Sequence, residues 1–131
     1  MRVIVCREFG PPEQLVLEER ASPTPAPGQV VVAVRAAGVN FTDVLATQGR
    51  SQLKIQPPFT PGVEVAGVVS RAGAGVTRLR EGMRVLATGF HGGYAEEIAF
   101  ADLEVVAIPD AMDFETAAAF KDLDAIAAMD G

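Results

Sequence analysis

The chain has 131 residues, of which 49% are hydrophobic and 21% charged, a composition that supports one folded domain with a buried core. Its formal net charge of −6 is the wrong sign for a protein that binds nucleic acid or an anionic membrane surface. The single cysteine excludes an internal disulfide and any zinc site built on two or four cysteines. Neither a signal peptide nor a transmembrane run is predicted, so we expect a cytoplasmic protein.

The 13 glycines and nine prolines predict short strands joined by turns rather than a helix bundle. Runs of apolar and β-branched residues predict strands at 2–6, 15–19, 29–37, 64–71, 84–88, 94–100 and 103–108. A short helix is expected at 40–47, with Asn40 as its N-cap. The proline-rich segments 21–28 and 50–61 are expected to be irregular connections. From Asp113 onward, apolar residues recur at three- and four-residue spacing, which predicts a C-terminal helix.

Several features that resemble functional sites have a simpler structural interpretation. Residues 73–76 (GAGV) lack the third glycine of a dinucleotide-binding fingerprint and no helical segment follows, so we expect a hairpin turn. Residues 89–93 lead into an alternating strand pattern and are expected to form a turn as well. His91 lies in this turn and is expected to be solvent-exposed. Cys6, in the first strand, is expected to be a structural thiol rather than a nucleophile.

Two polar features are not explained so simply. Asn40 and Asp43 lie three residues apart at a predicted strand-to-helix corner, and capping explains only Asn40. Glu64 is a lone carboxylate at the beginning of an otherwise apolar strand. We expect Glu64 to be paired or exposed, because burying an unpaired charge costs several kcal/mol.

Six segments, in the same order along the chain, resemble the N-terminal GroES-like catalytic domain of the medium-chain dehydrogenase/reductases. They are VNFTD at 39–43, PFTPGVEVAG at 58–67, GMRV at 82–85, GGYAE at 92–96, IPD at 108–110 and FETAAA at 114–119. The branch that they resemble most is the zinc-independent NADPH:quinone oxidoreductases. The resemblance covers residues 1–120 and implies a mainly β fold with a few short helices. This fold is a partly open GroES-like β-barrel with a C-terminal helix.

The resemblance also implies a chemistry. Zinc-dependent members of the superfamily carry a cysteine at the position of Asn40 and a histidine at that of Val63, and neither residue here is a usual zinc ligand. The implied reaction is hydride transfer from NADPH to a quinone or an activated alkene, without a metal. The implied site residues are catalytic Asn40 and Asp43, the substrate and nicotinamide cleft residues Phe41, Thr42 and Glu64, and the cofactor-binding residues Asn40 and Lys121.

The chain departs from the family pattern in two respects. Some relatives carry tyrosines at the positions of Leu45 and Ser51, whereas the one tyrosine here, Tyr94, is expected in the core. Residues 121–131 are interpreted as a C-terminal helical tail, so the Rossmann cofactor domain of the family is expected to be absent. One hypothesis places a deletion junction, natural or engineered, between Phe120 and Lys121.

Two functional interpretations follow. The first is the substrate-side domain of a zinc-independent, NADPH-dependent quinone or enone oxidoreductase. Binding of NADPH to this domain alone is expected to be weak or absent, because most of the recognition of a dinucleotide lies in the Rossmann domain. The second is a stand-alone GroES-like binding or scaffold module, or an engineered fragment, without catalysis. Both predict an exposed apolar face that docks a Rossmann domain or drives self-association, and neither involves nucleic acid or a membrane.

Overall fold

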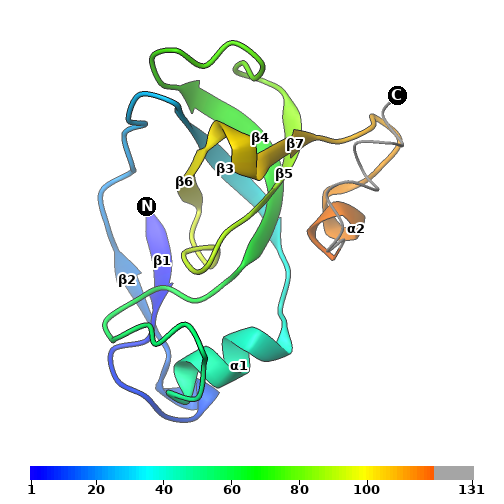
Figure 1. Cartoon of the computed structure of the whole chain (residues 1–131). Helices are drawn as coiled ribbons and strands as arrows, with labels where there is room; N and C mark the ends of the chain where they lie inside the picture. Colours follow the sequence, from blue (N-terminus) through cyan, green and yellow to red (C-terminus); the bar gives the residue numbers. More distant parts are fainter. Residues whose placement is uncertain (120–131) are drawn as a thin grey trace.

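The computed structural model describes residues 1–119, and these form a mainly β domain with two short helices (Figure 1). A five-stranded antiparallel sheet has the order β6-β3-β4-β5-β7. Its strands are β3 (Gln29–Ala37), β4 (Glu64–Ala72), β5 (Arg84–Thr88), β6 (Glu97–Ala101) and β7 (Val105–Ala107). A separate antiparallel ribbon consists of β1 (Arg2–Val5) and β2 (Val16–Glu19). The expected mainly β fold is confirmed.

The central strands β3 and β4 form the longest pairing of the sheet, and their sequences explain why. Both are rich in valine, whose branched side chain packs well on a pleated surface. Val30, Val32, Val65 and Val69 are all buried in the main core. Gly67 allows the two strands to approach closely, because a Cβ at this position would collide with the carbonyl group of Ala33.

Helix α2 (Phe114–Ala118) packs against β3 and β4 through a second apolar cluster, to which Leu86 of β5 also contributes. Ala117 and Ala118 contribute the buried face of the helix. Arg84 fixes the segment that leads into α2, since its guanidinium donates to the carbonyl oxygens of Pro109 at 3.0 Å and Met112 at 2.7 Å. The same guanidinium lies 4.5 Å from the centroid of the Phe114 ring, within cation–π distance.

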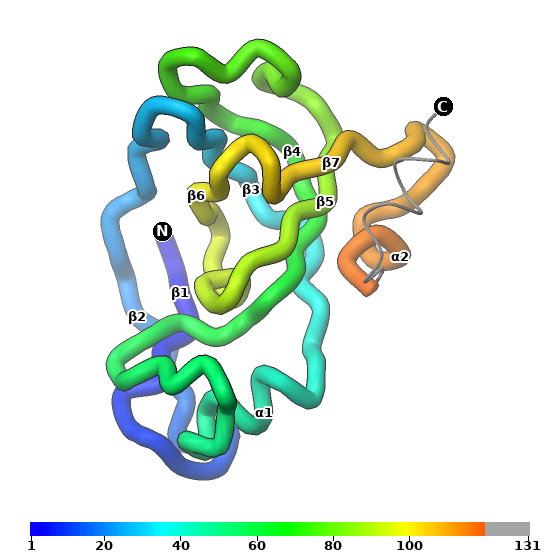
Figure 2. Tube along the Cα trace, viewed as in Figure 1, coloured from blue at the N-terminus to red at the C-terminus, as the bar shows by residue number. Residues whose placement is uncertain are grey.

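Helix α1 (Phe41–Thr47), the loop at 50–61 and the turn after β1 gather at one end of the domain (Figure 2). Cys6 and Phe59 exchange backbone hydrogen bonds of 2.8 and 3.1 Å, which attach the loop to the end of β1. The amide of Gly10 donates to the carbonyl oxygen of Thr47 at 2.9 Å and so holds the end of α1. A third apolar cluster of Cys6, Ala46 and Phe59 fills the space between them.

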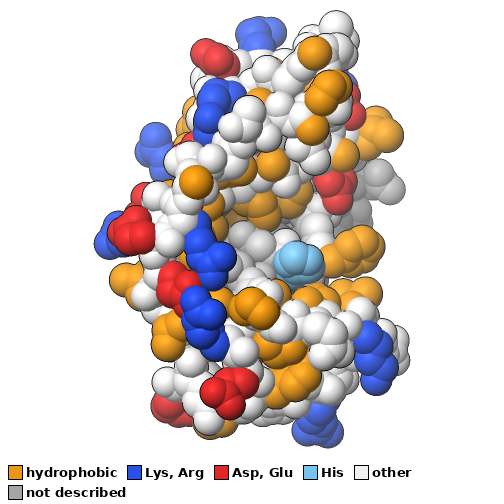
Figure 3. Space-filling model, turned by 90° about the vertical axis from the view of Figure 1, so that its left-hand side faces the viewer, with side chains coloured by type: hydrophobic (Ala, Val, Ile, Leu, Met, Phe, Trp, Pro, Cys, Tyr) orange, Lys and Arg blue, Asp and Glu red, His pale blue; other side chains and the backbone are white. Residues whose placement is uncertain are grey.

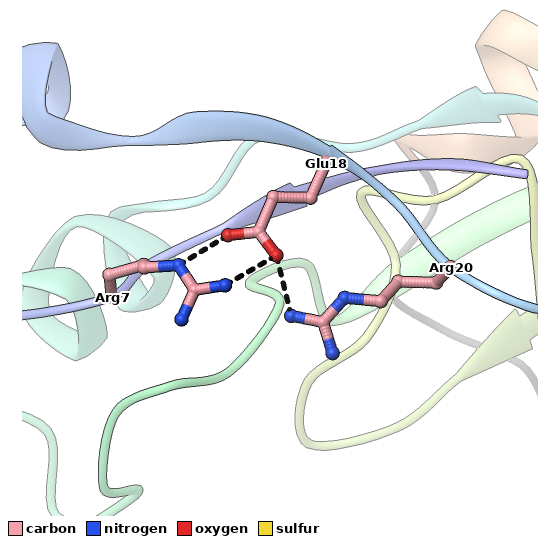
Figure 4. Close-up of polar contacts among 3 residues, drawn as sticks. All are labelled: Arg7, Glu18 and Arg20. Atoms are coloured by element: carbon pink, nitrogen blue, oxygen red, sulfur yellow. Dashed lines mark hydrogen bonds and ion pairs between the residues drawn. The ribbon is translucent and has the colours of Figure 1, made fainter.

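The β1–β2 ribbon carries a cluster of charged side chains on its surface (Figure 4). Oε1 of Glu18 accepts from Nη2 of Arg7 at 2.7 Å and from Nη2 of Arg20 at 2.8 Å. The hydrogen bonds from Arg7 are the main reason that the pKa of Glu18 is lowered below its ordinary value. Paired in this way, Glu18 of β2 joins Arg7, which follows β1, to Arg20, which follows β2.

Most predicted elements lie where the sequence places them, with two corrections. The sixth strand begins at Glu97 rather than at residue 94, because residues 94–96 bond to β1 instead, through an isolated bridge between Val3 and Ala95. The seventh begins at Val105 rather than at residue 103, because Asp102–Glu104 form a 3₁₀ turn, η2. A second 3₁₀ turn, η1, spans Pro12–Gln14.

Other expectations are also resolved. The glycine-rich segments 73–76 and 89–93 are turns between strands, as expected. Cys6 is a buried thiol whose pKa is raised by burial, which agrees with a structural role. Helix α2 confirms the start of the predicted C-terminal helix, whereas the tail 121–131 lies outside the described residues. Over residues 1–119, no helix has the length and apolar character needed to cross a bilayer.

Candidate active site

A cavity of about 310 Å³ opens between α1, the loop at 50–61 and the turn that precedes β6. Its wall is mainly apolar and includes Leu45, Leu53, Ile55, Phe59, Val63 and Phe90. Polar groups enter it from Thr42, Asp43, Arg50, Ser51, Gln52 and His91. A second cavity, of about 320 Å³, shares Phe59 with the first as a lining residue, but none of the predicted site residues lines it. The cavity between α1 and the loop at 50–61 is therefore the candidate site, and we call it the α1 cavity.

His91 stands at the rim of the α1 cavity. The space-filling view shows hydrophobic side chains on both sides of the histidine, the only one in the chain (Figure 3). Its ring meets the ring of Phe59 edge-on, with centroids 6.3 Å apart and an interplanar angle of 78°. The expectation that His91 is exposed is confirmed, but sequence reasoning missed its place on the wall of a cavity.

Asn40 and Glu64 meet at the corner where β3 leads into α1. Asn40 has extended backbone angles, φ −123° and ψ 159°, and α1 begins at the next residue, as an N-cap requires. Its Nδ2 donates to Oε1 of Glu64 at 3.1 Å. Glu64 begins β4 and is only 3% exposed. Of the two alternatives expected for Glu64, exposure is not found, and within residues 1–119 its side-chain partner is this neutral amide rather than a cation.

Asp43 is the centre of a second buried network. It is 4% exposed, and its Oδ2 accepts from the backbone N–H of Asn40 at 2.9 Å and from the hydroxyl of Tyr94 at 3.0 Å. Its Oδ1 accepts from the backbone N–H of Gly62 at 3.1 Å. With three donors, the carboxylate ties α1 to the segments before β4 and β6. Burial raises the pKa of the Tyr94 phenol, and the adjacent charge of Asp43 raises it further.

The structure brings together most of the predicted site residues. Asn40, Asp43 and Glu64 form one hydrogen-bonded group, while Thr42 and Asp43 line the α1 cavity. Phe41 is 73% exposed and is not among the residues that line the cavity. Lys121 lies outside the described residues.

Two positions at which the sequence departs from some relatives can now be placed. Leu45 and Ser51, the positions at which some relatives have tyrosines, both line the α1 cavity. Tyr94, which sequence reasoning placed in the core, is only partly buried and directs its hydroxyl to Asp43. No local pattern could have shown this contact, since the two residues are 51 positions apart.

The donor set of this corner is poor in metal ligands. Val63, at the position of the histidine in zinc-dependent relatives, has no donor atom in its side chain. In the part of the chain that the structure describes, no three His, Cys, Asp or Glu side chains gather closely enough to hold a metal ion.

Comparison with known proteins places this geometry in a family. Residues 26–110 match the family model of the alcohol dehydrogenase GroES-like domain. The chain is 40% identical over 121 residues to the human synaptic vesicle membrane protein VAT-1 homolog, covering 91% of this chain and 31% of that protein. It is also 40% identical over 121 residues to the quinone oxidoreductase of Lama guanicoe, covering 91% of this chain and 37% of that protein. The chain thus spans about a third of the length of these curated relatives.

Solved structures agree. The quinone oxidoreductase of Escherichia coli complexed with NADPH superimposes with a TM-score of 0.84 at 31% identity, over 92% of this chain and 37% of that one. A probable oxidoreductase from Mycobacterium abscessus gives a TM-score of 0.86 at 43% identity, over 90% of this chain and 38% of that one. The chain therefore belongs to the alcohol dehydrogenase GroES-like domain family, in the quinone oxidoreductase-like branch of the medium-chain dehydrogenase/reductases.

Proposed function

We propose that this chain is the substrate-side domain of a zinc-independent, NADPH-dependent oxidoreductase that reduces quinones or activated alkenes. The observation that carries the proposal is the apolar α1 cavity beside the corner formed by Asn40, Asp43 and Glu64. Small-molecule pockets are mostly apolar, with a few placed polar groups, and span about 300–1,000 Å³. At about 310 Å³, the α1 cavity has room for one small ring.

In this proposal, the apolar and the polar residues of the α1 cavity have different roles. Apolar walls from Leu45, Phe59 and Val63 hold the ring and exclude water, which strengthens polar interactions inside. Ser51 and His91 are candidate donors to a substrate carbonyl oxygen, in place of the tyrosines of some relatives. NADPH, when bound, supplies the hydride.

The described residues fit only one end of that cofactor. The Asn40 amide is a polar partner of the kind a nicotinamide carboxamide needs. The glycine-rich turns at 73–76 and 89–93 join strands and do not open helices, so neither provides a phosphate cradle. Weak binding of NADPH to this chain is therefore part of the proposal, as are a cofactor contact from Lys121, the domain boundary at residue 120 and a cytoplasmic location.

Exposed apolar side chains beside the α1 cavity are an argument for a second domain as the partner of this chain. Val39, Phe41 and Phe90 are large hydrophobic side chains that are exposed beside this corner and the α1 cavity. A cofactor-binding domain docked here would cover them, and self-association of the isolated chain is the alternative that a concentration series would detect.

The test is a titration of the isotope-labelled chain with cyclohexenone, followed by backbone amide NMR. We expect shift changes confined to the α1 cavity, with loss of binding in Leu45→Trp, which fills the cavity. Leu17→Trp, an exposed substitution on β2, is the matched control and should bind as the unmodified chain does. Shift changes centred on another face, or binding that Leu45→Trp leaves intact, would refute the proposal.

A further inference from the structure

Glu64 is a buried carboxylate whose role the reaction above does not explain. Its Oε1 accepts from Nδ2 of Asn40 at 3.1 Å, and no basic side chain among residues 1–119 forms an ion pair with it. A buried charge is costly unless hydrogen bonds compensate it. Its retention at this corner calls for an explanation in terms of the group that it contacts.

The contact decides which end of the Asn40 amide is free. A side-chain amide has an acceptor oxygen and an NH₂ group, whereas an ionised carboxylate can only accept. Glu64 therefore holds the NH₂ group, and a flipped amide would place two acceptor oxygens against each other. The carbonyl oxygen Oδ1 of Asn40 faces the backbone N–H of Asp43 in the capping box of α1, and its second lone pair is left for another partner.

The backbone of Asn40 is held as firmly as its side chain. Its N–H donates to Oδ2 of Asp43 at 2.9 Å, and Asp43 is itself fixed by the N–H of Gly62 and the hydroxyl of Tyr94. Two buried carboxylates thus act on one residue, one on its main chain and one on its amide.

The space around Glu64 is equally restricted. A Cβ at Gly38 would collide with the Glu64 carboxylate and with the carbonyl oxygen of Ala118. The N–H of Gly38 also donates to the backbone carbonyl of Glu64 at 3.0 Å. The carboxylate is therefore packed into one position, facing Asn40.

We propose that Glu64 is a positioning residue that orients Asn40 to offer its carbonyl oxygen, and not its NH₂ group, to the ligand of this corner. The complementary ligand group is a hydrogen-bond donor, as the carboxamide N–H of a nicotinamide is. This inference rests on the proposed function for the identity of the ligand, but the orientation itself needs no ligand.

The orientation is tested on the chain alone. Asn40 is the only asparagine, so labelling with isotopic asparagine gives a single NH₂ pair in the NMR spectrum. The two protons of an amide NH₂ group always give separate signals, because rotation about the C–N bond is slow. We expect the proton that faces Glu64 to be shifted from its free-amide position and protected from solvent exchange. Glu64→Leu should move the signal of the hydrogen-bonded proton toward that of a free amide and remove its protection, and Glu64→Gln, which keeps an acceptor oxygen, should largely restore both. Glu97→Leu, on β6 and away from the corner, is the matched control.

The ligand arm uses reduced nicotinamide mononucleotide as the probe. We expect Glu64→Leu to weaken its binding about tenfold, the usual effect of a lost or mispaired hydrogen bond, with recovery in Glu64→Gln. An Asn40 NH₂ pair that exchanges freely in the unmodified chain, or that Glu64→Leu leaves unchanged, would overturn the orientation. If Glu64→Leu does not fold, the solvent exchange of the Asn40 NH₂ pair in the unmodified chain still tests the orientation.

These experiments distinguish a failure of the positioning role of Glu64 from a failure of the proposed function. A protected NH₂ pair with no response to the mononucleotide would leave the orientation standing and count against the proposed function. Binding of the mononucleotide with equal affinity in the unmodified chain and in Glu64→Leu would contradict the positioning role while the proposed function stands.

Discussion

Removal of the Tyr94 hydroxyl tests the account of the Asp43 network most simply. Tyr94→Phe keeps the ring and deletes the donor that lies 3.0 Å from Oδ2 of Asp43. A hydrogen bond to a charged group contributes about 1.5–3 kcal/mol, and the lower part of that range applies because Asp43 keeps two backbone donors. We expect a loss of about 1.5–2 kcal/mol in the free energy of unfolding.

The assay is urea unfolding at neutral pH, supported by a thermal scan. At about 4 °C per kcal/mol for a domain of this size, the melting temperature should fall by about 6–8 °C. In an Asp43→Asn background the same substitution should cost clearly less, because the charge that strengthens the bond is gone. Thr77→Val removes an exposed hydroxyl and should stay within about 0.5 kcal/mol of the unmodified chain. An unchanged stability of Tyr94→Phe, or an equal cost in both backgrounds, would refute the reasoning.

Three further outcomes are expected. The chain has one tyrosine and no tryptophan, so near-ultraviolet absorbance should show the raised pKa of Tyr94: the folded chain should not ionise near pH ~10. Stability linked to this raised pKa is present below pH ~10 and is lost as the pH rises through the folded value. Leu86→Ala, in the buried cluster under α2, should cost about 2–5 kcal/mol in urea unfolding, whereas Leu103→Ala, at a side chain 87% exposed, should cost little. Glu18→Gln should destabilise the chain at pH ~7, and the difference should vanish as acid titration passes below the lowered pKa of Glu18, since that contribution exists only while Glu18 is ionised.

The strands could be predicted because each is a local pattern. The β-branched run at 29–37, bounded by Gly28 and Gly38, suffices to place β3 at Gln29–Ala37, as observed. The start of β6 was misplaced because residues 94–96 alternate like a strand but pair with β1, and pairing partners are not written in a local pattern.

The site was predictable only as far as local spacing reaches. Asn40 and Asp43 could be grouped by their spacing, but the expectation that capping explains only Asn40 was wrong, because Oδ2 of Asp43 accepts from the N–H of Asn40 and completes a capping box. The contacts of Glu64 with Asn40 and of Tyr94 with Asp43 join residues 24 and 51 positions apart, and only the folded chain brings them together. The same is true of His91, whose place on the cavity wall depends on Phe59.

The most direct test of the central claim is to locate the bound substrate ring. In a complex of the isotope-labelled chain with cyclohexenone, the account predicts nuclear Overhauser contacts between the ring protons and the methyl groups of Leu45 and Val63. Both side chains line the α1 cavity, next to the Asn40 corner. Contacts to methyl groups on another face, with none to these two residues, would contradict the proposal that this chain is a substrate-side domain.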